Sequence, residues 1–391
     1  MENVIKCGKE RESYLIALRR ELHRRPELAL REYETAAVVE RELDKVGVEH
    51  RRVGATGVLG VLRGAAPGES VALRADIDAL PIQEESGAAY RSETDGVMHA
   101  CGHDAHTACL LGAAGILAER RDAFSGEVRL IFQPAEETGG GAADFINAGT
   151  LRGVRRVFGL HVAPDLPAGT VGITPGLNNA AVDHFRVKIH GKSAHVAAPQ
   201  LGADALYAAS QIVVAVQGLV ARRTSPTEPV ILGIGKLNAG TTYNAVAEYA
   251  ELEGTTRTVS QTARLEARER IDETARHISA VSGAEAETVW TGICSALVNA
   301  PEVCAEAQAV ARELGLSVVG NRPLSLSGDN FAEYLSQVPG CYAYLGTANE
   351  ALPNTLAGIH NSHFDLDESA LATGAALYAA CALRWLANPE E

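Results

Sequence analysis

Short apolar segments alternate with helical segments through the first half of the chain, and this alternation constrains the fold more than any other feature. The segments with strand character are GVLGVLRG, SVALRAD, GEVRLIF and VRRVFGL, and a late one is GCYAYLG. Helical segments such as TACLLGAAGILAERR lie between them. Strands and helices that alternate in this way predict an α/β domain whose sheet is largely parallel.

The pattern changes between about residues 179 and 295. DHFRVKIH alternates as a strand does, and ADALYAASQIVVAVQGLVARR is helical. Two further strands, a helix and a last strand follow. The order βαββαβ is that of a ferredoxin-like unit. We therefore expect one domain formed by residues 1–178 and 296–391, and an inserted domain formed by residues 179–295.

Composition narrows the class of protein and of partner. Of the 391 residues, 46% are hydrophobic and 21% are charged, as in ordinary folded proteins. The formal net charge is −14, without a large cluster of Lys and Arg, which argues against binding to nucleic acid or to an anionic membrane. No signal-peptide core, no membrane-spanning segment and no paired cysteine spacing are evident. We expect a cytoplasmic protein that binds small molecules or proteins.

Residues 98–109, MHACGHDAHTAC, concentrate side chains that bind metal ions. Cys101 and His103 lie where a loop enters a predicted helix, and Asp104 is placed to cap that helix. Both side chains could reach one cation. A buried free thiol beside a hydrogen-bonded imidazole explains the pair equally well, so the interpretation depends on other candidates.

Further candidate ligands follow predicted strands. The adjacent carboxylates Glu136 and Glu137 come after EVRLIF, His161 comes after VRRVFGL, and His360 lies in GIHNSHFDLDE after the last strand. Open α/β sheets bind ligands at the carboxyl ends of their strands. Hydrolytic metal sites need a few N, O and S donors with room for water. A solvated acidic loop is the alternative for the two glutamates, but the coincidence of positions favours a metal site.

Several motifs, in order along nearly the whole chain, resemble the metal-dependent amidohydrolase branch of the aminoacylase/carboxypeptidase family. The segments that carry the resemblance are RADIDALP, HACGHDAHTACLLGAA, FQPAEE, GLHVAPDLPAG, AHVAAPQLGAD, LEGTTRT and FDLDE. That branch includes hippurate hydrolases, indole-acetyl-amino-acid hydrolases and N-acetyldiaminopimelate deacetylases. The resemblance implies an α/β catalytic domain that holds two metal ions, with an inserted ferredoxin-like α+β lid that also forms a homodimer.

The resemblance also implies roles for residues of the catalytic domain. Glu136 corresponds to the general base, which takes a proton from the attacking water and delivers it to the leaving nitrogen. Asp78 corresponds to a carboxylate that orients a ligand, with structural capping as the alternative. The two divalent ions could be zinc, manganese, cobalt or nickel. The implied metal ligands are Cys101, whose thiolate would bridge the ions, His103, Glu137, His161 and His360.

Residues of the inserted domain match substrate-contacting positions of the family. His195 matches a histidine that stabilises the tetrahedral oxyanion, commonly in the partner subunit's active site. Asn244 and Arg257 match positions that hold the substrate's carbonyl or carboxylate. A turn histidine and a surface ion-pair arginine are the structural alternatives. In the catalytic domain, His106 is either beside the site or packed on its helix. The residues given a purely structural interpretation are Arg74, Asp76, His23, His99 and His363.

The chain departs from the usual pattern of this branch at several positions. SGDNF occupies residues 327–331, where Gly-Ser-Glu-Asp-Phe is common. Gln200 replaces a frequent histidine, and Ala247 and Ser362 replace frequent prolines. The change to Asn330 removes one negative charge, which bears on metal preference if the segment lies near the ions. None of these changes removes an expected ligand or the expected base.

The leading hypothesis is a metal-dependent amidohydrolase that cleaves the amide bond of N-acyl amino acids. A dipeptidase, a carboxypeptidase or a hydrolytic deaminase could use the same dinuclear site, and only the substrate pocket separates these activities. A non-catalytic binding protein could lose Glu136 freely, so the presence of this residue favours an enzyme. An enzyme that uses Cys101 as its nucleophile is a further alternative.

Overall fold

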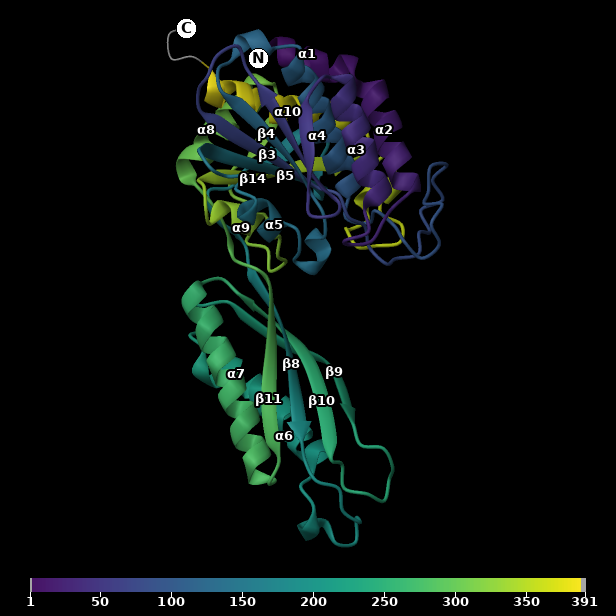
Figure 1. Ribbon diagram of the computed structural model, residues 1–391, viewed down its shortest axis with the longest axis vertical. Coiled ribbons are helices and arrows are strands. Elements are labelled where there is room, and N and C mark those ends of the chain that lie inside the picture. Colours follow the sequence, from purple (N-terminus) through teal and green to yellow (C-terminus); the bar gives the residue numbers. More distant parts are fainter. Residues whose placement is uncertain (1, 388–391) are drawn as a thin grey trace. The chain divides into compact units, whose positions relative to one another are not determined.

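The computed structural model describes residues 2–387, and Figure 1 shows their helices and strands. The chain divides into two compact units. One, which we call the main unit, contains the residues up to Asn178, Val298–Pro323 and the residues from Asp329 onward. The other, which we call the inserted unit, contains Asn179–Leu297 and Leu324–Gly328.

An eight-stranded sheet forms the centre of the main unit, in the order β1-β2-β4-β3-β5-β14-β6-β13. Its strands are β1 (Glu49–Val53), β2 (Gly57–Arg63), β3 (Ser70–Asp76), β4 (Glu127–Gln133), β5 (Val154–Pro167), β6 (Thr170–Gly172), β13 (Ser317–Val319) and β14 (Gly340–Ala348). The central strands β4, β3, β5 and β14 are parallel. β1 and β2 are antiparallel additions at one edge, and β6 is antiparallel to β14. The predicted α/β fold with a mainly parallel sheet is confirmed.

Helices cover both faces of this sheet. They are α1 (Glu2–Glu10), α2 (Glu12–Arg24), α3 (Tyr33–Lys45), α4 (His103–Ala118), α5 (Ala142–Asn147), α8 (Pro301–Glu313), α9 (Phe331–Leu335) and α10 (Ala370–Leu386). Phe158 and Gly159 are neighbours on β5 and therefore point to opposite faces. Phe158 packs against Tyr378 and Trp385 of α10, whereas Gly159 lies against Phe331 of α9. The large helices and the small α9 thus lie on opposite sides.

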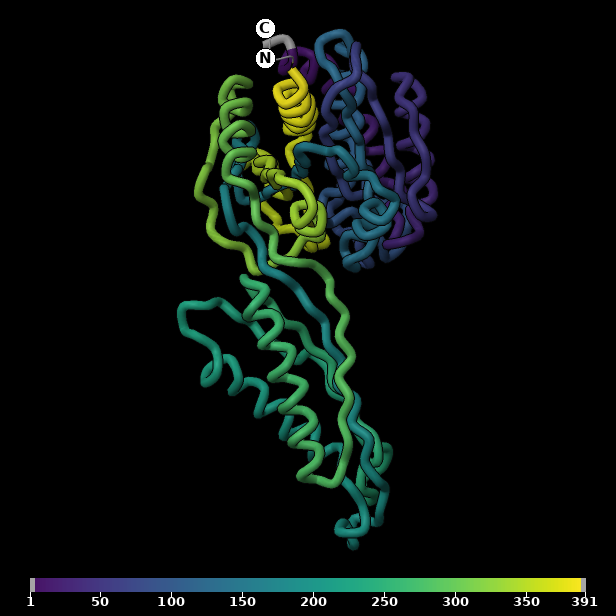
Figure 2. Tube along the Cα trace, turned by 60° about the vertical axis from the view of Figure 1, so that its left-hand side comes forward, coloured from purple at the N-terminus to yellow at the C-terminus, as the bar shows by residue number. Residues whose placement is uncertain are grey.

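Helix α4 is buried from His103 to Leu117, with apolar side chains all round. A helix of this kind belongs in a core, and α4 packs against the sheet and against its neighbour α10, which also contacts the sheet. The first and last helices, α1 and α10, pack together beside it, as Figure 2 shows in purple and yellow. A Cβ at Gly8 of α1 would lie 2.5 Å from the carbonyl oxygen of Ala372 in α10. The hydroxyl of Thr107 in α4 donates to the carbonyl oxygen of Asp76, the last residue of β3, at 3.1 Å, which ties the start of α4 to the carboxyl end of the sheet.

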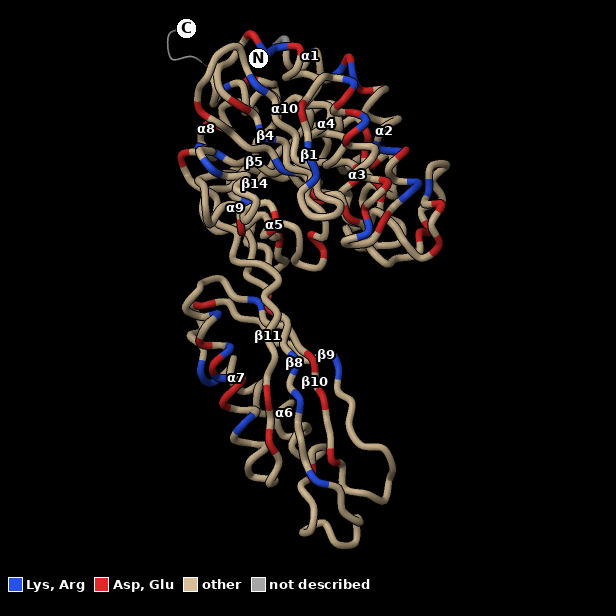
Figure 3. The backbone as a smooth tube through the Cα atoms, in the orientation of Figure 1, with Lys and Arg blue, Asp and Glu red and all other residues tan. Residues whose placement is uncertain are grey.

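The inserted unit is a four-stranded antiparallel sheet with two helices, in the strand order β11-β8-β10-β9. Its elements are β8 (Ala181–His190), α6 (Ala205–Arg223), β9 (Val230–Ala239), β10 (Tyr249–Thr258), α7 (Gln261–Val281) and β11 (Glu285–Cys294). This is the predicted βαββαβ order, and the ferredoxin-like fold is confirmed. Acidic and basic residues follow one another along α7 (Figure 3).

The remaining elements are short. A two-stranded sheet pairs β7 (Gly176–Asn179) with β12 (Leu297–Asn299). The 3₁₀ helices are η1 (Arg121–Ala123), η2 (Glu136–Thr138), η3 (Pro199–Leu201) and η4 (Pro353–Leu356). Residues 324–328 lie with the inserted unit because Ser325 pairs with Asn179.

Helix α6 differs from one expectation. By length and composition it could cross a membrane, so the prediction that no segment approaches the necessary length was wrong. One side of α6, including Ala208, Ile212 and Val216, is buried in a cluster with Phe185 and Leu252 of the adjacent sheet. Because core helices meet the same criterion, the length of α6 is weak evidence for a membrane span.

Candidate active site

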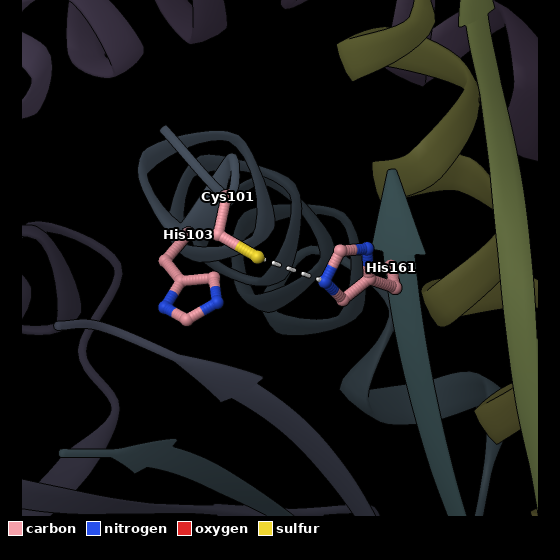
Figure 4. Close-up of side chains that lie close together, drawn as sticks. All are labelled: Cys101, His103 and His161. Carbon is pink, nitrogen blue, oxygen red and sulfur yellow. Dashed lines mark hydrogen bonds between the residues drawn. The ribbon is translucent and has the colours of Figure 1, made fainter. Parts of the chain in front are cut away.

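The residues predicted as metal ligands converge at the carboxyl end of the main sheet. Cys101 lies two residues before α4, and His103 is the first residue of that helix. His161 lies on β5, with its Nε2 atom 3.4 Å from the Sγ atom of Cys101 (Figure 4). Glu137 follows β4, and its Oε1 atom is 3.8 Å from Nε2 of His103 and 3.4 Å from Nε2 of His360. Two groups suited to a metal ion, Cys101 with His103 and His161, and Cys101 with Glu137 and His360, therefore share the thiol.

Hydrogen bonds turn two of these histidines so that one nitrogen is left for a metal. Nδ1 of His103 donates to Oδ1 of Asp78 at 3.2 Å, and Nδ1 of His161 donates to the carbonyl oxygen of Val162 at 2.8 Å. Each Nε2 atom then carries the lone pair, as metal-bound histidines require. Among the described residues, Nε2 of His103 and Oε1 of Glu137 are buried without a hydrogen-bond partner. The two atoms lie 3.8 Å apart on donors suited to a metal, so this pair fits a cation.

His106 lies beside the site but is not free to bind a metal. Its Nδ1 atom donates to Oδ1 of Asp76 at 2.6 Å, and its Nε2 atom accepts the backbone N–H of Val162 at 2.9 Å. Asp76 also accepts a hydrogen bond from Arg74 at 2.7 Å. Both ring nitrogens of His106 are therefore used, and the question that the sequence leaves open is answered. Hydrogen bonds among these three residues therefore join β3, which carries Arg74 and Asp76, to α4, which carries His106, next to the candidate ligands.

Asp78 contacts two of the predicted ligands at once. Its Oδ1 atom accepts from His103, and its Oδ2 atom accepts the backbone N–H of Glu137 at 3.0 Å. The side chain is buried. Through these two bonds Asp78 fixes the start of α4 relative to the turn after β4, which is the geometry expected of a residue that orients ligands.

Glu136 is the candidate base and is adjacent in sequence to Glu137. Its Oε1 atom accepts the backbone N–H of Asn330 at 3.1 Å. Burial raises the pKa of Glu136 well above its usual range, and the carboxylates of Asp329 and Glu137 raise it further. A carboxyl group with a raised pKa holds a proton taken from water more readily than an ordinary one.

The unusual segment Asp329-Asn330 contacts this turn directly. Oδ1 of Asn330 accepts from Gln133 at 2.8 Å and from Arg74 at 3.1 Å, and its Nδ2 atom donates to the carbonyl oxygen of Gly140 at 2.7 Å. An aspartate in this place could not donate to Gly140. The amide is thus matched to its neighbours, and the departure from the usual pattern lies next to the candidate base.

The candidate substrate-binding residues lie in the inserted unit. The loops that carry His195 and Asn244 pair through a bridge between His195 and Ala245, so these two residues are close neighbours. Both side chains are exposed. Nδ1 of His195 accepts the backbone N–H of Ala197 at 3.0 Å. Arg257, on β10, is half-buried, and its guanidinium has no hydrogen bond or ion pair within residues 2–387, which leaves the surface ion-pair alternative without support.

Glu32 is a residue that the sequence analysis missed. Its side chain is fully buried, and its Oε1 atom accepts the backbone N–H of Ala135 at 2.9 Å, one residue before Glu136. In the sequence, Glu32 is marked only as an acidic residue just before a helix. Acidic residues are common there because they interact favourably with the helix dipole, so the position does not indicate a role at the site. The contact joins positions 103 residues apart and is visible only in the folded chain.

Comparison with known proteins decides the family. The sequence profile of peptidase family M20/M25/M40 matches residues 72–384. The chain belongs to this family. It is therefore a hydrolase that acts on amide bonds by metal-dependent chemistry, and the resemblance seen in the sequence is confirmed.

Similar proteins cover nearly the whole chain. The N-acetyl-L-cysteine deacetylase of Bacillus subtilis is 40% identical over 381 residues, which are 97% of this chain and 90% of the relative. Thermostable carboxypeptidase 2 of Saccharolobus solfataricus is 39% identical over 386 residues, 96% of each chain. The crystal structure of the YXEP protein of Bacillus subtilis, a dinuclear metal-binding peptidase of the M20 family, matches with a TM-score of 0.83 and 37% identity over 97% of this chain and 99% of that one.

Proposed function

We propose that this enzyme removes acetyl, benzoyl or similar acyl groups from N-acyl amino acids. One observation carries the proposal: the donors suited to a metal include two buried atoms without a hydrogen-bond partner, Nε2 of His103 and Oε1 of Glu137, and the carboxylate of Glu136 lies beside them. The similarity to an N-acetyl-L-cysteine deacetylase over 97% of the chain supports an N-acyl amino acid as the substrate.

The proposed ligands would hold two divalent ions. Cys101 belongs to both groups of donors and would be shared between the ions. When bound, the ions would polarise the amide carbonyl and lower the pKa of water. The thiol and imidazole donors favour zinc, cobalt or nickel, whereas the carboxylate also admits manganese. The ligands are Cys101, His103, Glu137, His161 and His360.

Glu136 carries the proton in this proposal. Its carboxylate accepts a proton from the attacking water and then delivers it to the leaving nitrogen. Glu137 is unsuited to this task because a carboxylate engaged by a cation is a poor base. The backbone N–H of Asn330 holds Glu136 in place, and Asp78 holds the adjacent residue by its backbone.

Residues of the inserted unit would bind the substrate. His195 would donate a hydrogen bond to the oxyanion, and its Nδ1 atom is already engaged with Ala197, which leaves Nε2 for this purpose. Asn244 would hold the carbonyl group. Arg257 would bind the carboxylate of the amino-acid half through two parallel hydrogen bonds.

We also propose a homodimer formed through the inserted unit. β9 is an edge strand, and an edge strand can pair with a second chain. Apolar side chains are exposed on it and on α6, among them Ile231, Leu237, Tyr207 and Val214. Light scattering is expected to give twice the mass of one chain, and Val214→Asp is expected to shift the equilibrium toward the monomer.

Carboxypeptidase activity is the second candidate. Thermostable carboxypeptidase 2 of Saccharolobus solfataricus is as similar to this chain as the deacetylase, with 39% against 40% identity. Both reactions break an amide bond next to a free carboxylate, so they place the same demands on the base and on Arg257. The substrate pocket alone separates them.

A substrate panel tests the proposal. The enzyme, reconstituted with zinc or with manganese, would be assayed on N-acetyl and N-benzoyl amino acids, on N-acetylcysteine and on blocked dipeptides, beside Glu136→Ala. The proposal predicts metal-dependent release of the free amino acid from the acyl compounds, lost in the variant. Preferential cleavage of the blocked dipeptides would favour the carboxypeptidase, and release of ammonia alone would contradict both.

A further inference from the structure

The strained backbone positions of this chain are connected to the candidate active site. Among the described residues, Leu30, Ala135 and His360 are the non-glycine residues with positive φ, at 62°, 58° and 61°. His360 is a proposed ligand, and Ala135 comes immediately before Glu136. Side chains other than glycine rarely adopt this conformation, and it persists only where the surrounding structure enforces it.

A single carboxylate contacts two of the three strained residues. Oε1 of Glu32 accepts the backbone N–H of Leu30 at 3.0 Å and that of Ala135 at 2.9 Å. Its Oε2 atom accepts the hydroxyl of Thr56 at 2.7 Å. Glu32 is fully buried, so water does not compete for these bonds. The side chain therefore joins three segments: the entry to α3, the turn between β1 and β2, and the turn after β4.

The turn after β4 is held on its other side as well. The carbonyl oxygen of Ala135 accepts the backbone N–H of Gly140 at 2.8 Å. A Cβ at Gly141 would lie 2.1 Å from the carbonyl oxygen of Pro134, so the loop packs closely on itself. Without an acceptor at Glu32, the buried N–H of Ala135 would have to find another partner, and the turn would have to move.

We propose that Glu32 is a positioning residue that holds Ala135 in its left-handed conformation and thereby directs Glu136 and Glu137 into the active site. Glu32 touches neither substrate nor metal ions in this account. The inference rests on the proposed roles of Glu136 and Glu137, because a rotated turn matters to catalysis only if these side chains do the chemistry.

Variants of Glu32 separate the length of the side chain from its charge. Glu32→Asp keeps the charge but withdraws the carboxylate by about one bond, roughly 1.5 Å. Glu32→Gln loses the charge but keeps an oxygen that accepts both N–H groups, while the hydroxyl of Thr56 turns to accept from the amide. Glu42→Asp is the matched control, because Glu42 is also buried but bonds only to Tyr14, Arg41 and Lys45, away from the turn.

The readouts are kcat and KM per folded, metal-loaded subunit, with the melting temperature measured beside them. Glu32→Asp is expected to lower kcat by about 10- to 100-fold, since misplacement of about 1 Å costs up to about 100-fold. Its KM is expected to stay within about twofold, because substrate contacts are unchanged. Glu32→Gln is expected to keep most of the wild-type kcat. Glu42→Asp is expected to lower the melting temperature without changing kcat.

A wild-type kcat in folded Glu32→Asp would overturn the inference, since it would make Glu32 merely structural. A loss of kcat in Glu32→Gln as large as that in Glu32→Asp would also overturn it, by showing that charge and not the acceptor geometry matters. If Glu32→Asp does not fold, Glu32→Gln alone tests the inference. A low kcat in folded Glu32→Gln would then overturn the positioning role of Glu32. Glu136→Ala at the wild-type rate would instead refute the proposed base, whatever the Glu32 variants do.

Discussion

The candidate functional side chains of the two units differ in their surroundings. In the main unit, ionisable groups beside the candidate ligands are buried and bonded to one another, as Arg74, Asp76 and His106 are. In the inserted unit, the proposed functional side chains His195 and Asn244 are exposed and bond only within their own loops. The candidate ligands of the main unit are thus fixed by neighbouring side chains and backbone, whereas His195 and Asn244 keep exposed side chains that a ligand could reach.

Loss of the shared thiol is expected to have the largest effect. Cys101→Ala removes a donor common to both groups of candidate ligands, so we expect fewer bound ions per chain and no measurable hydrolysis. Metal analysis and activity assays check both. Cys109→Ala is the control, because Cys109 is equally buried on α4 but its thiol faces the carbonyl oxygen of Leu371. Equal metal content and equal activity in Cys101→Ala and Cys109→Ala would show that Cys101 is not a metal ligand.

His195 tests whether the inserted unit contributes to the chemical step. We expect His195→Ala to lower kcat by about 100- to 1,000-fold, which is the usual cost of one lost oxyanion donor. Metal content is expected to stay unchanged, since His195 belongs to the other unit. His190→Ala serves as the control, because it removes a histidine whose ring lies at a tilt beside that of Tyr249 in the same sheet. An unchanged kcat would show that His195 is only a structural residue of its turn.

Arg257 is expected to affect substrate binding more than turnover. Arg257→Ala removes the proposed contact with the substrate's carboxylate, so KM should rise by about tenfold or more, with a smaller change in kcat. Arg257→Lys should restore little, because an ammonium cannot make the paired hydrogen bonds of a guanidinium. Kinetics with an acyl amino acid and with its amide, which lacks the carboxylate, measure this. A KM that rises equally for both substrates would contradict the assignment.

Asp183 is expected to affect stability and not activity. Burial raises the pKa of this carboxyl group, but hydrogen bonds from Arg264 and Arg268 outweigh that effect and leave the pKa below its usual 3.8. The ionised Asp183 therefore contributes its full stabilisation at pH values above the pKa of the unfolded chain. That stabilisation is lost as the pH falls through the lower pKa of the folded protein. Asp183→Asn should cost about 2 kcal/mol at pH 7.

Thermal unfolding at pH 7 and at pH 3 checks this prediction. The gap in melting temperature between the wild type and Asp183→Asn should narrow at the lower pH, and kcat at pH 7 should be unchanged. A gap that widens on acidification would contradict the assigned direction of the pKa shift. A large loss of kcat in Asp183→Asn would show that the reaction depends on this ion network of the inserted unit.

Much of this arrangement follows from local sequence patterns. The carboxyl ends of parallel strands meet at one edge, so the positions of Glu137 and His161 after predicted strands were enough to place both near Cys101. Alternation and helical periodicity were enough to predict the inserted βαββαβ unit. Both signals are short-range, and a single sequence carries them.

The rest depends on contacts between distant segments. The tautomer of His106 is set by Asp76 and Val162, 30 and 56 residues away. The hydrogen bond between Glu32 and Ala135 joins residues that are 103 positions apart in the sequence, and no sequence motif predicts it. The exposed apolar side chains of α6, among them Tyr207 and Val214, were also not predicted from the sequence. Long-range hydrogen bonds leave no periodic trace, and only the folded chain displays them.

The central claim is that Glu136 is the base and the neighbouring donors hold the metal ions. The most direct measurement is kcat together with the metal content of Glu136→Gln, an uncharged side chain of nearly the same shape. We expect a wild-type metal content and a kcat lowered by about 100- to 10,000-fold. A wild-type kcat would contradict the role of Glu136 as base, and a loss of metal would show that Glu136 is itself a ligand.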